Sequence, residues 1–175
     1  MGRRRRVSHA ANDTPLACVL HTVCCMPITS ALELLTTQHD EIEALLVSVT
    51  AATSSAVRTA ALSDLADKLT LHLAVEQELL YPAANQLISD EVRTEMLAEH
   101  QEIKRVLADL IWLEHEDRRF ARKLVTLQTL LQWHEAWQET ELFERLAQGL
   151  PAPQLANLAS DVESYFDHNT FSVAA

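Results

Sequence analysis

The stretch QHDEIEALL at residues 38–46 recurs as EHQEIKRVL at residues 99–107. A second stretch, HLAVEQELLY at residues 72–81, recurs as HEAWQETELF at residues 134–143. The recurrences are shifted by 61 and 62 residues, so both halves of the chain carry the same two segments in the same order. This repeat predicts two copies of one hairpin about a pseudo-twofold axis, with equivalent residues facing one shared interior.

Composition and residue spacing indicate that these hairpins are helical. The chain of 175 residues has only 2 glycines and 5 prolines. Between Ile28 and Gln148 there is no glycine and a single proline, Pro82. A β-sheet protein needs such residues at its turns, whereas apolar side chains here recur at helical spacing. We therefore predict an all-α fold, an antiparallel up-down-up-down four-helix bundle.

Start and stop signals set the expected boundaries of the helices. Ser30 and Glu33 form a capping box, Ser89 caps the third helix, and Pro82 is expected to end or kink the second. The four-helix bundle is expected within residues 30–150, followed by residues 151–175 as a short helix and a tail. The first expected helix begins at Ser30, and the next two run over about residues 57–80 and 91–114. The fourth follows a charged turn at residues 116–119 and runs to about residue 147, and a short fifth helix is expected over residues 154–166.

Residues 1–29 differ from the rest of the chain. They hold an arginine run and all three cysteines, Cys18, Cys24 and Cys25, without a CxxC pair. Polar residues interrupt any apolar core, so we expect a disordered tail rather than a signal peptide. The cysteine usage favours a reducing cytoplasm without a disulfide framework.

Charge and hydropathy exclude two classes of partner. The formal net charge is −11, although the arginine run contributes four of the 14 basic residues. A body this acidic repels phosphate backbones, so we predict no nucleic-acid binding. The sequence has no apolar run of about 18 residues, so we predict no membrane span.

Four histidines mark equivalent points of the repeat, one in each expected helix. Their neighbours three or four positions away are mostly apolar, which places the imidazoles on core-facing stripes. Glu76 lies four residues after one of these histidines and faces the same way. A buried carboxylate without partners is very costly, and a metal ion would compensate it. The histidines are His39, His72, His100 and His134.

A second carboxylate is expected in the fourth helix. Glu139 follows His134 by five residues, about 140° round the helix, so it needs a long reach or a distorted turn. Gln138 has the favourable spacing of four but is not an anionic ligand. We predict Glu139 as the ligand, with Gln138, Glu135 and Glu141 as alternatives. Four histidines and two carboxylates are too many for one tetrahedral zinc ion and suit two metal ions.

The combination resembles the hemerythrin-like proteins of the HHE cation-binding family over about residues 30–150. That pattern has a lone His, then H-x3-E before Tyr-Pro, another lone His, and a His with a following acid before Leu-Phe. The resemblance implies a bundle around two non-haem iron ions joined by an oxo or hydroxo bridge. The same ligands would also accept manganese or zinc. The matching residues are His39, His72 and Glu76 before Tyr81-Pro82, His100, and His134 and Glu139 before Leu142-Phe143.

The sequence departs from the oxygen-carrying hemerythrins at several points. The carriers have H-x3-H in the third helix, whereas Met96 and Lys104 stand four residues either side of His100. Water, Tyr81 or no group takes the place of the missing histidine. The fourth helix has glutamate where the carriers have aspartate, and Gln138 replaces an acid often seen in HHE sequences. A more open iron favours reactivity over stable reversible carriage.

Three functions follow as hypotheses. The preferred one is a di-iron protein that binds or senses a small oxidant, namely O2, NO or peroxide, with a separate protein partner if it is a sensor. The alternative is a di-iron enzyme that decomposes hydrogen peroxide or reduces NO in stress defence. The third, a metal-free helical interaction module, is disfavoured by the buried His/Glu set.

Overall fold

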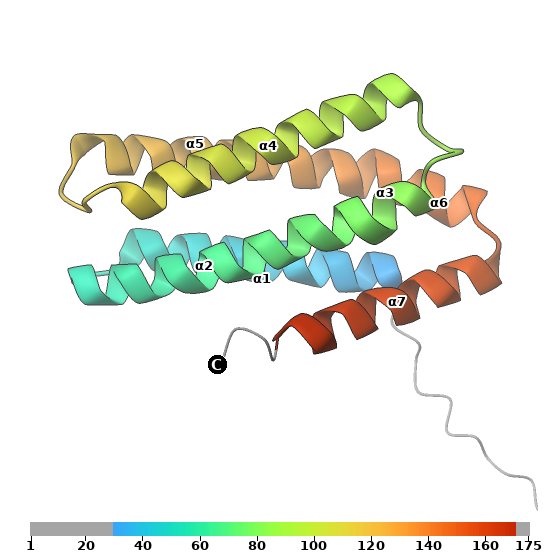
Figure 1. Ribbon diagram of the computed structural model, residues 1–175, viewed down its shortest axis with the longest axis horizontal. Helices are drawn as coiled ribbons and strands as arrows, with labels where there is room; N and C mark the ends of the chain where they lie inside the picture. Colours follow the sequence, from blue (N-terminus) through green and yellow to red (C-terminus); the bar gives the residue numbers. More distant parts are fainter. Residues whose placement is uncertain (1–29, 171–175) are drawn as a thin grey trace, which may run out of the picture.

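The computed structural model describes residues 30–170, and every element in that range is helical (Figure 1). The predicted tail at residues 1–29, with its three cysteines, and residues 171–175 lie outside the described residues. Within residues 30–170, no helix is both long enough and apolar enough to span a lipid bilayer. The predicted all-α class is confirmed.

The helical elements join into five long stretches. Two of these stretches each consist of three consecutive helical segments. Each stretch runs back in the direction opposite to the one before it, and the last, α7, lies along α1 and α2 (Figure 1). The segments α2, η1 and α3 follow one another without a break, as do α5, η2 and α6. The bounds are α1 Ala31–Ala51, α2 Ser55–Val75, η1 Glu76–Leu80, α3 Tyr81–Ala83, α4 Asp90–Trp112, α5 Arg118–Trp137, η2 Gln138–Leu142, α6 Phe143–Gly149 and α7 Ala152–Thr170.

Side-chain caps define where the long helices begin. The hydroxyl of Ser30 accepts a hydrogen bond from the backbone N–H of Glu33, and the Glu33 carboxylate accepts one from the backbone of Ser30. Ser89 caps α4 through the N–H of Val92. These contacts satisfy backbone donors that have no partner inside the helix. Both caps predicted from the sequence are confirmed.

The fifth helix is longer than predicted. It runs over Ala152–Thr170 rather than residues 154–166, and it packs along α1. Its apolar side chains Leu158, Ala159 and Val162 are buried in the bundle. The helix is therefore part of the packed body and not a frayed appendage.

Two π-helical turns interrupt the second and fourth long stretches. The segment η1 begins at Glu76 and η2 at Gln138, which are equivalent positions of the repeat. In each, a backbone N–H donates to the carbonyl five residues earlier, from Tyr81 to Glu76 and from Phe143 to Gln138. Short π segments inside α-helices are frequent at functional sites. The helix continues past Pro82 as far as Ala83, so this proline does not end it at once.

Two apolar clusters fill the bundle, one toward each end. One cluster contains Ile42, Leu69, Ile103 and Leu131, and the other contains Leu35, Val75, Met96 and Leu142. Along each of the four helical stretches, the chain passes from one cluster to the other at its histidine. The bundle is therefore two apolar cores separated by a polar layer.

The tightness of this packing can be tested within α5. Leu127 is fully buried, whereas Val125 is 62% exposed. We expect Leu127→Ala to lower the free energy of unfolding by about 2–5 kcal/mol, because it leaves a cavity. Val125→Ala should change it by less than about 0.5 kcal/mol. Urea denaturation of both variants measures the difference, and equal losses would contradict this assignment of the core.

Candidate metal centre

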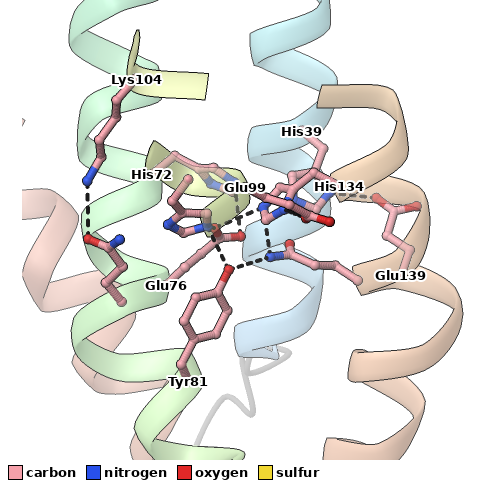
Figure 2. A network of polar contacts seen from close by, with 11 residues as sticks. His39, His72, Glu76, Tyr81, Glu99, Lys104, His134 and Glu139 are labelled. Carbon is pink, nitrogen blue, oxygen red and sulfur yellow. Dashed lines mark hydrogen bonds and ion pairs between the residues drawn. The ribbon is translucent and has the colours of Figure 1, made fainter. Parts of the chain in front are cut away.

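Four imidazoles meet in the polar layer between the two apolar clusters. They come from four different helices, with His39 on α1, His72 on α2, His100 on α4 and His134 on α5. Each is at most 3% exposed. The structure therefore brings all four predicted histidines into one buried site. Figure 2 shows His39, His72 and His134 from this site.

The carboxylate of Glu76 lies among these imidazoles and is fully buried. Its Oε2 is 2.9 Å from Nε2 of His100 and 3.2 Å from Nε2 of His134. Its Oε1 is 3.2 Å from Nε2 of His72. Burial alone would raise the pKa of Glu76, but the charges of His72 and His134 and hydrogen bonds with His100 and His134 hold it well below its usual value. Glu76 is therefore an anion at neutral pH.

The ligand-type atoms form two adjacent groups that share Glu76. In each group, the atoms of all three residues lie within 4.8 Å of one another. The imidazoles are paired edge to face, His39 with His72 at 5.0 Å between ring centroids and His100 with His134 at 4.9 Å. The predicted pseudo-twofold relation between the hairpins is thus visible in the site. The first group is His39, His72 and Glu76, and the second is Glu76, His100 and His134.

Two further carboxylates contact histidines from the outside. Oε1 of Glu139 lies 2.7 Å from Nδ1 of His39, and Oε2 of Glu99 lies 3.2 Å from Nδ1 of His134. Both carboxylates are largely exposed, at 40% for Glu139 and 51% for Glu99. Such contacts fix the orientation of an imidazole and raise its basicity as a ligand. The structure thus places Glu139 beside His39 and not within either group of three, and its role as a metal ligand stays a prediction.

Gln138 and Tyr81 complete the buried layer on the side of the second group. Gln138 is fully buried, and its amide nitrogen lies 3.0 Å from Nε2 of His134. The same amide donates to the hydroxyl of Tyr81 at 3.4 Å. The Tyr81 hydroxyl lies 2.6 Å from Nε2 of His100 (Figure 2). Gln138 was one of the alternatives to Glu139 as the ligand from the fourth helix. The structure places its side chain in the buried layer.

The first group fits a metal ion because its inward atoms lack hydrogen bonds. Nε2 of His39, Nε2 of His72 and Oε1 of Glu76 are all buried without a hydrogen-bond partner. Buried polar atoms in folded proteins are rarely left in this state. A cation bound by two imidazole nitrogens and one carboxylate oxygen would satisfy all three, and this donor set suits iron, manganese or zinc.

Comparisons with known proteins show the family and the fold of the chain. The family model of the hemerythrin HHE cation-binding domain matches residues 30–146. The chain belongs to this family. A crystal structure of a hemerythrin HHE cation-binding domain-containing protein from Mycobacterium kansasii is similar, with a TM-score of 0.71 and 20% sequence identity. The match covers 82% of this chain and 88% of that one. No curated protein sequence matches significantly.

Protonation states in this HHE bundle differ between the histidines. Burial lowers the pKa of His39 and of His100, so both are neutral imidazoles, the form that binds metals. Burial also disfavours charge on His134, but the carboxylates of Glu76 and Glu99 outweigh it and raise its pKa to about 9. Without a metal ion, His134 thus carries the positive charge that balances Glu76.

The sequence analysis did not predict a role for Glu99. This residue lies on α4, and its carboxylate contacts Nδ1 of His134 on α5. The signal available was the repeat, because Glu99 immediately precedes His100 as Gln38 precedes His39. A repeat alone does not tell which exposed side chain reaches across to another helix.

The raised pKa of His134 predicts how stability varies with pH in the metal-free HHE bundle. His134 holds its proton more tightly when folded, so its stabilising contribution is complete below pH 6.5 and is lost as the pH rises toward about 9. We expect Glu99→Gln to make the fall in the free energy of unfolding across this window smaller. Urea denaturation after chelation, at both ends of the window, measures the slope. An identical slope in the variant would contradict the role of Glu99.

Proposed function

We propose that this chain is a non-haem di-iron protein that binds or senses a small oxidant, namely O2, NO or peroxide. The observation that carries the proposal is the buried layer, in which four histidines surround Glu76 and three inward-facing ligand atoms have no hydrogen-bond partner. Two groups of three that share one carboxylate support two adjacent ions. Manganese and zinc are compatible with the same donors.

The chain's own residues would hold, orient and enclose such ions. His39, His72, Glu76, His100 and His134 are the proposed ligands, with Glu139 as the sixth predicted one. Bound iron would supply a redox-active Lewis acid that binds and polarises a small oxidant. The apolar clusters on both sides of the layer exclude water from it. Glu99 would orient His134 through the Nδ1 atom of that ring.

A surface pocket lies next to Tyr81, the residue whose hydroxyl contacts the layer. It has a volume of about 310 Å³, and its lining includes Tyr81, Arg93 and Leu97. Tyr81 is among the lining residues, and its hydroxyl contacts His100. A small pocket beside Tyr81 suits a molecule with two heavy atoms, such as O2, NO or hydrogen peroxide, better than an organic substrate.

The Tyr81 hydroxyl favours the enzymatic alternative, a di-iron enzyme that decomposes hydrogen peroxide or reduces NO in stress defence. Burial and the negative charge of Glu76 raise the pKa of Tyr81, so in the metal-free site the phenol keeps its proton. Reduction of NO to N2O consumes two protons for every two NO molecules, and decomposition of two hydrogen peroxide molecules to water and O2 moves protons between oxygen atoms without net uptake. A phenol beside the ligands is placed to deliver a proton in either reaction. A stoichiometric adduct without turnover supports the binder, and sustained turnover supports the enzyme.

The cellular setting is part of the same proposal. A cytoplasmic location is inferred from the cysteine usage of the sequence. As a sensor, the protein would act through a separate protein partner, and the acidic composition argues against nucleic acid as that partner.

Removing the shared carboxylate should lower metal content and stability together. We expect Glu76→Ala to purify with less than half the iron of the wild type, and its melting temperature should no longer rise when iron is added, because metal binding stabilises the folded state. Glu78→Ala, two residues along the same π turn at an exposed position, is the matched control. Metal analysis and thermal denaturation test both, and unchanged iron occupancy in Glu76→Ala would exclude Glu76 as a ligand.

Reaction with an oxidant should depend on the layer. We expect His72→Ala to lose the optical change on addition of hydrogen peroxide or NO to the iron-loaded protein, together with any oxygen release from peroxide. His168→Ala, at an exposed position of α7, should retain both. Stopped-flow absorbance and an oxygen electrode measure these effects. Full reactivity in His72→Ala would show that the chemistry occurs elsewhere.

A further inference from the structure

The outward face of α5 carries no charge along its centre, although the chain as a whole has a formal net charge of −11. Between Lys123 and Glu135 there is no acidic or basic residue. The exposed side chains of this part of α5 recur at helical spacing and therefore lie on one side of the helix. We call this surface the neutral α5 face. Its residues are Val125, Thr126, Thr129, Gln132, Trp133 and Ala136.

Two large apolar side chains on the neutral α5 face are open to solvent. Trp133 is 76% exposed and Val125 is 62% exposed. The fifth long helix leaves them uncovered, because α7 packs along α1 and α2 on the side of the bundle away from α5 (Figure 1). Tryptophan is enriched at the centres of protein interfaces, where it contributes much of the binding energy. The exposed indole therefore marks this face as a binding surface.

Charges of opposite sign lie at the two ends of the neutral α5 face. Residues 118–123, RRFARK, contain four bases and no acid, whereas residues 135–144, EAWQETELFE, contain four acids and no base. Arg118 and Arg122 are exposed at the first end, and Glu141 and Glu144 are exposed at the second. A surface with a basic end, a neutral centre and an acidic end is complementary to a second copy of itself that runs in the opposite direction.

We propose that the neutral α5 face binds a second copy of this chain, with the two α5 helices antiparallel about a twofold axis near Thr129. The basic end of each helix then lies beside the acidic end of the other, whereas a parallel pair would bring like charges together. The same residues serve both copies across such an axis. Trp133 lies against the first half of the opposite helix, near the partner's Arg122, whose guanidinium can stack on the indole.

The dimensions of α5 suit a stable pair. Residues 118–144 span about 40 Å of helix at about 1.5 Å per residue. Together with the flanking edges of α1 and α4, an antiparallel pair would bury roughly 800 Å² per chain, which is the usual size of a stable interface. The inference does not depend on bound metal, so it can be tested on the metal-free chain.

Sedimentation equilibrium of the metal-free full chain is the first test. We expect a dimer with a dissociation constant below about 10 µM, weakened at about 0.5 M salt because charge pairs are screened. Trp133→Ala should weaken the dimer at least about tenfold. Trp112→Ala is the matched control, because Trp112 is 87% exposed at the end of α4 and lies outside the neutral α5 face.

Two results of this experiment would overturn the proposal. A chain that stays monomeric up to about 100 µM would leave the neutral α5 face to a different protein. A dimer weakened by Trp112→Ala and not by Trp133→Ala would place the contact at the end of α4. Helicity measured by circular dichroism confirms that each variant is folded.

Charge reversal tests the two complementary ends. Arg118→Glu with Arg122→Glu makes both ends of the face acidic, and Glu141→Arg with Glu144→Arg makes both ends basic. We expect each double variant alone to associate at least about tenfold more weakly than the wild type. An equimolar mixture of the two should associate again, because opposite charges then meet at both ends. Association unchanged by both double variants would overturn the charge pairing.

Single cysteines test the direction of the helices, in a chain whose native Cys18, Cys24 and Cys25 are changed to serine. Thr129→Cys should form a disulfide between copies, because the two positions meet at the axis. Ala136→Cys should not, since its two copies lie about 20 Å apart along antiparallel helices, too far for a disulfide. Crosslinking of Ala136→Cys, or none of Thr129→Cys, would overturn the antiparallel arrangement.

Discussion

The buried charge of Glu76 is the constraint on which the rest of the structure depends. Its carboxylate is fully shielded from water and has three imidazoles within 3.2 Å. Isolating a carboxylate in this way carries an effective penalty of several kcal/mol, so positive charge has to be supplied next to it. Without metal, a protonated His134 supplies that charge. A bound cation would supply it more completely and would also satisfy the unpartnered atoms of His39 and His72.

The fold keeps this layer in register by placing it between two apolar clusters. Each helix contributes leucines and related residues above and below its histidine, so the imidazoles cannot rotate out without opening a core. The π turns start at Glu76 and Gln138, directly at the layer. Tyr81 and Phe143, which follow the π turns, lie beside the imidazoles. The ring of Tyr81 is tilted against that of His100 (Figure 2 shows Tyr81). The ring of Phe143 is stacked on that of His39, with 6.1 Å between the ring centroids.

Much of this arrangement could be predicted from the sequence, because periodicity and the repeat depend only on local spacing. The four histidines and Glu76 lie on apolar stripes, so any helical bundle of this pattern must bury them. The choice between Gln138 and Glu139 could not be made in this way. The distorted turn that Glu139 would need is present, but it begins at Gln138, which leaves the spacing from His134 to Gln138 α-helical and keeps Gln138 inward. Glu99 was missed because its partner lies on another helix.

The most direct test of the central claim is an anomalous difference map from a crystal of the iron-loaded protein, recorded at the iron absorption edge. This account predicts one peak within bonding distance of His39, His72 and Glu76, and a second beside His100 and His134. A layer without any anomalous peak, or iron bound only by surface carboxylates, would contradict the assignment of the buried histidines and Glu76 as a metal centre.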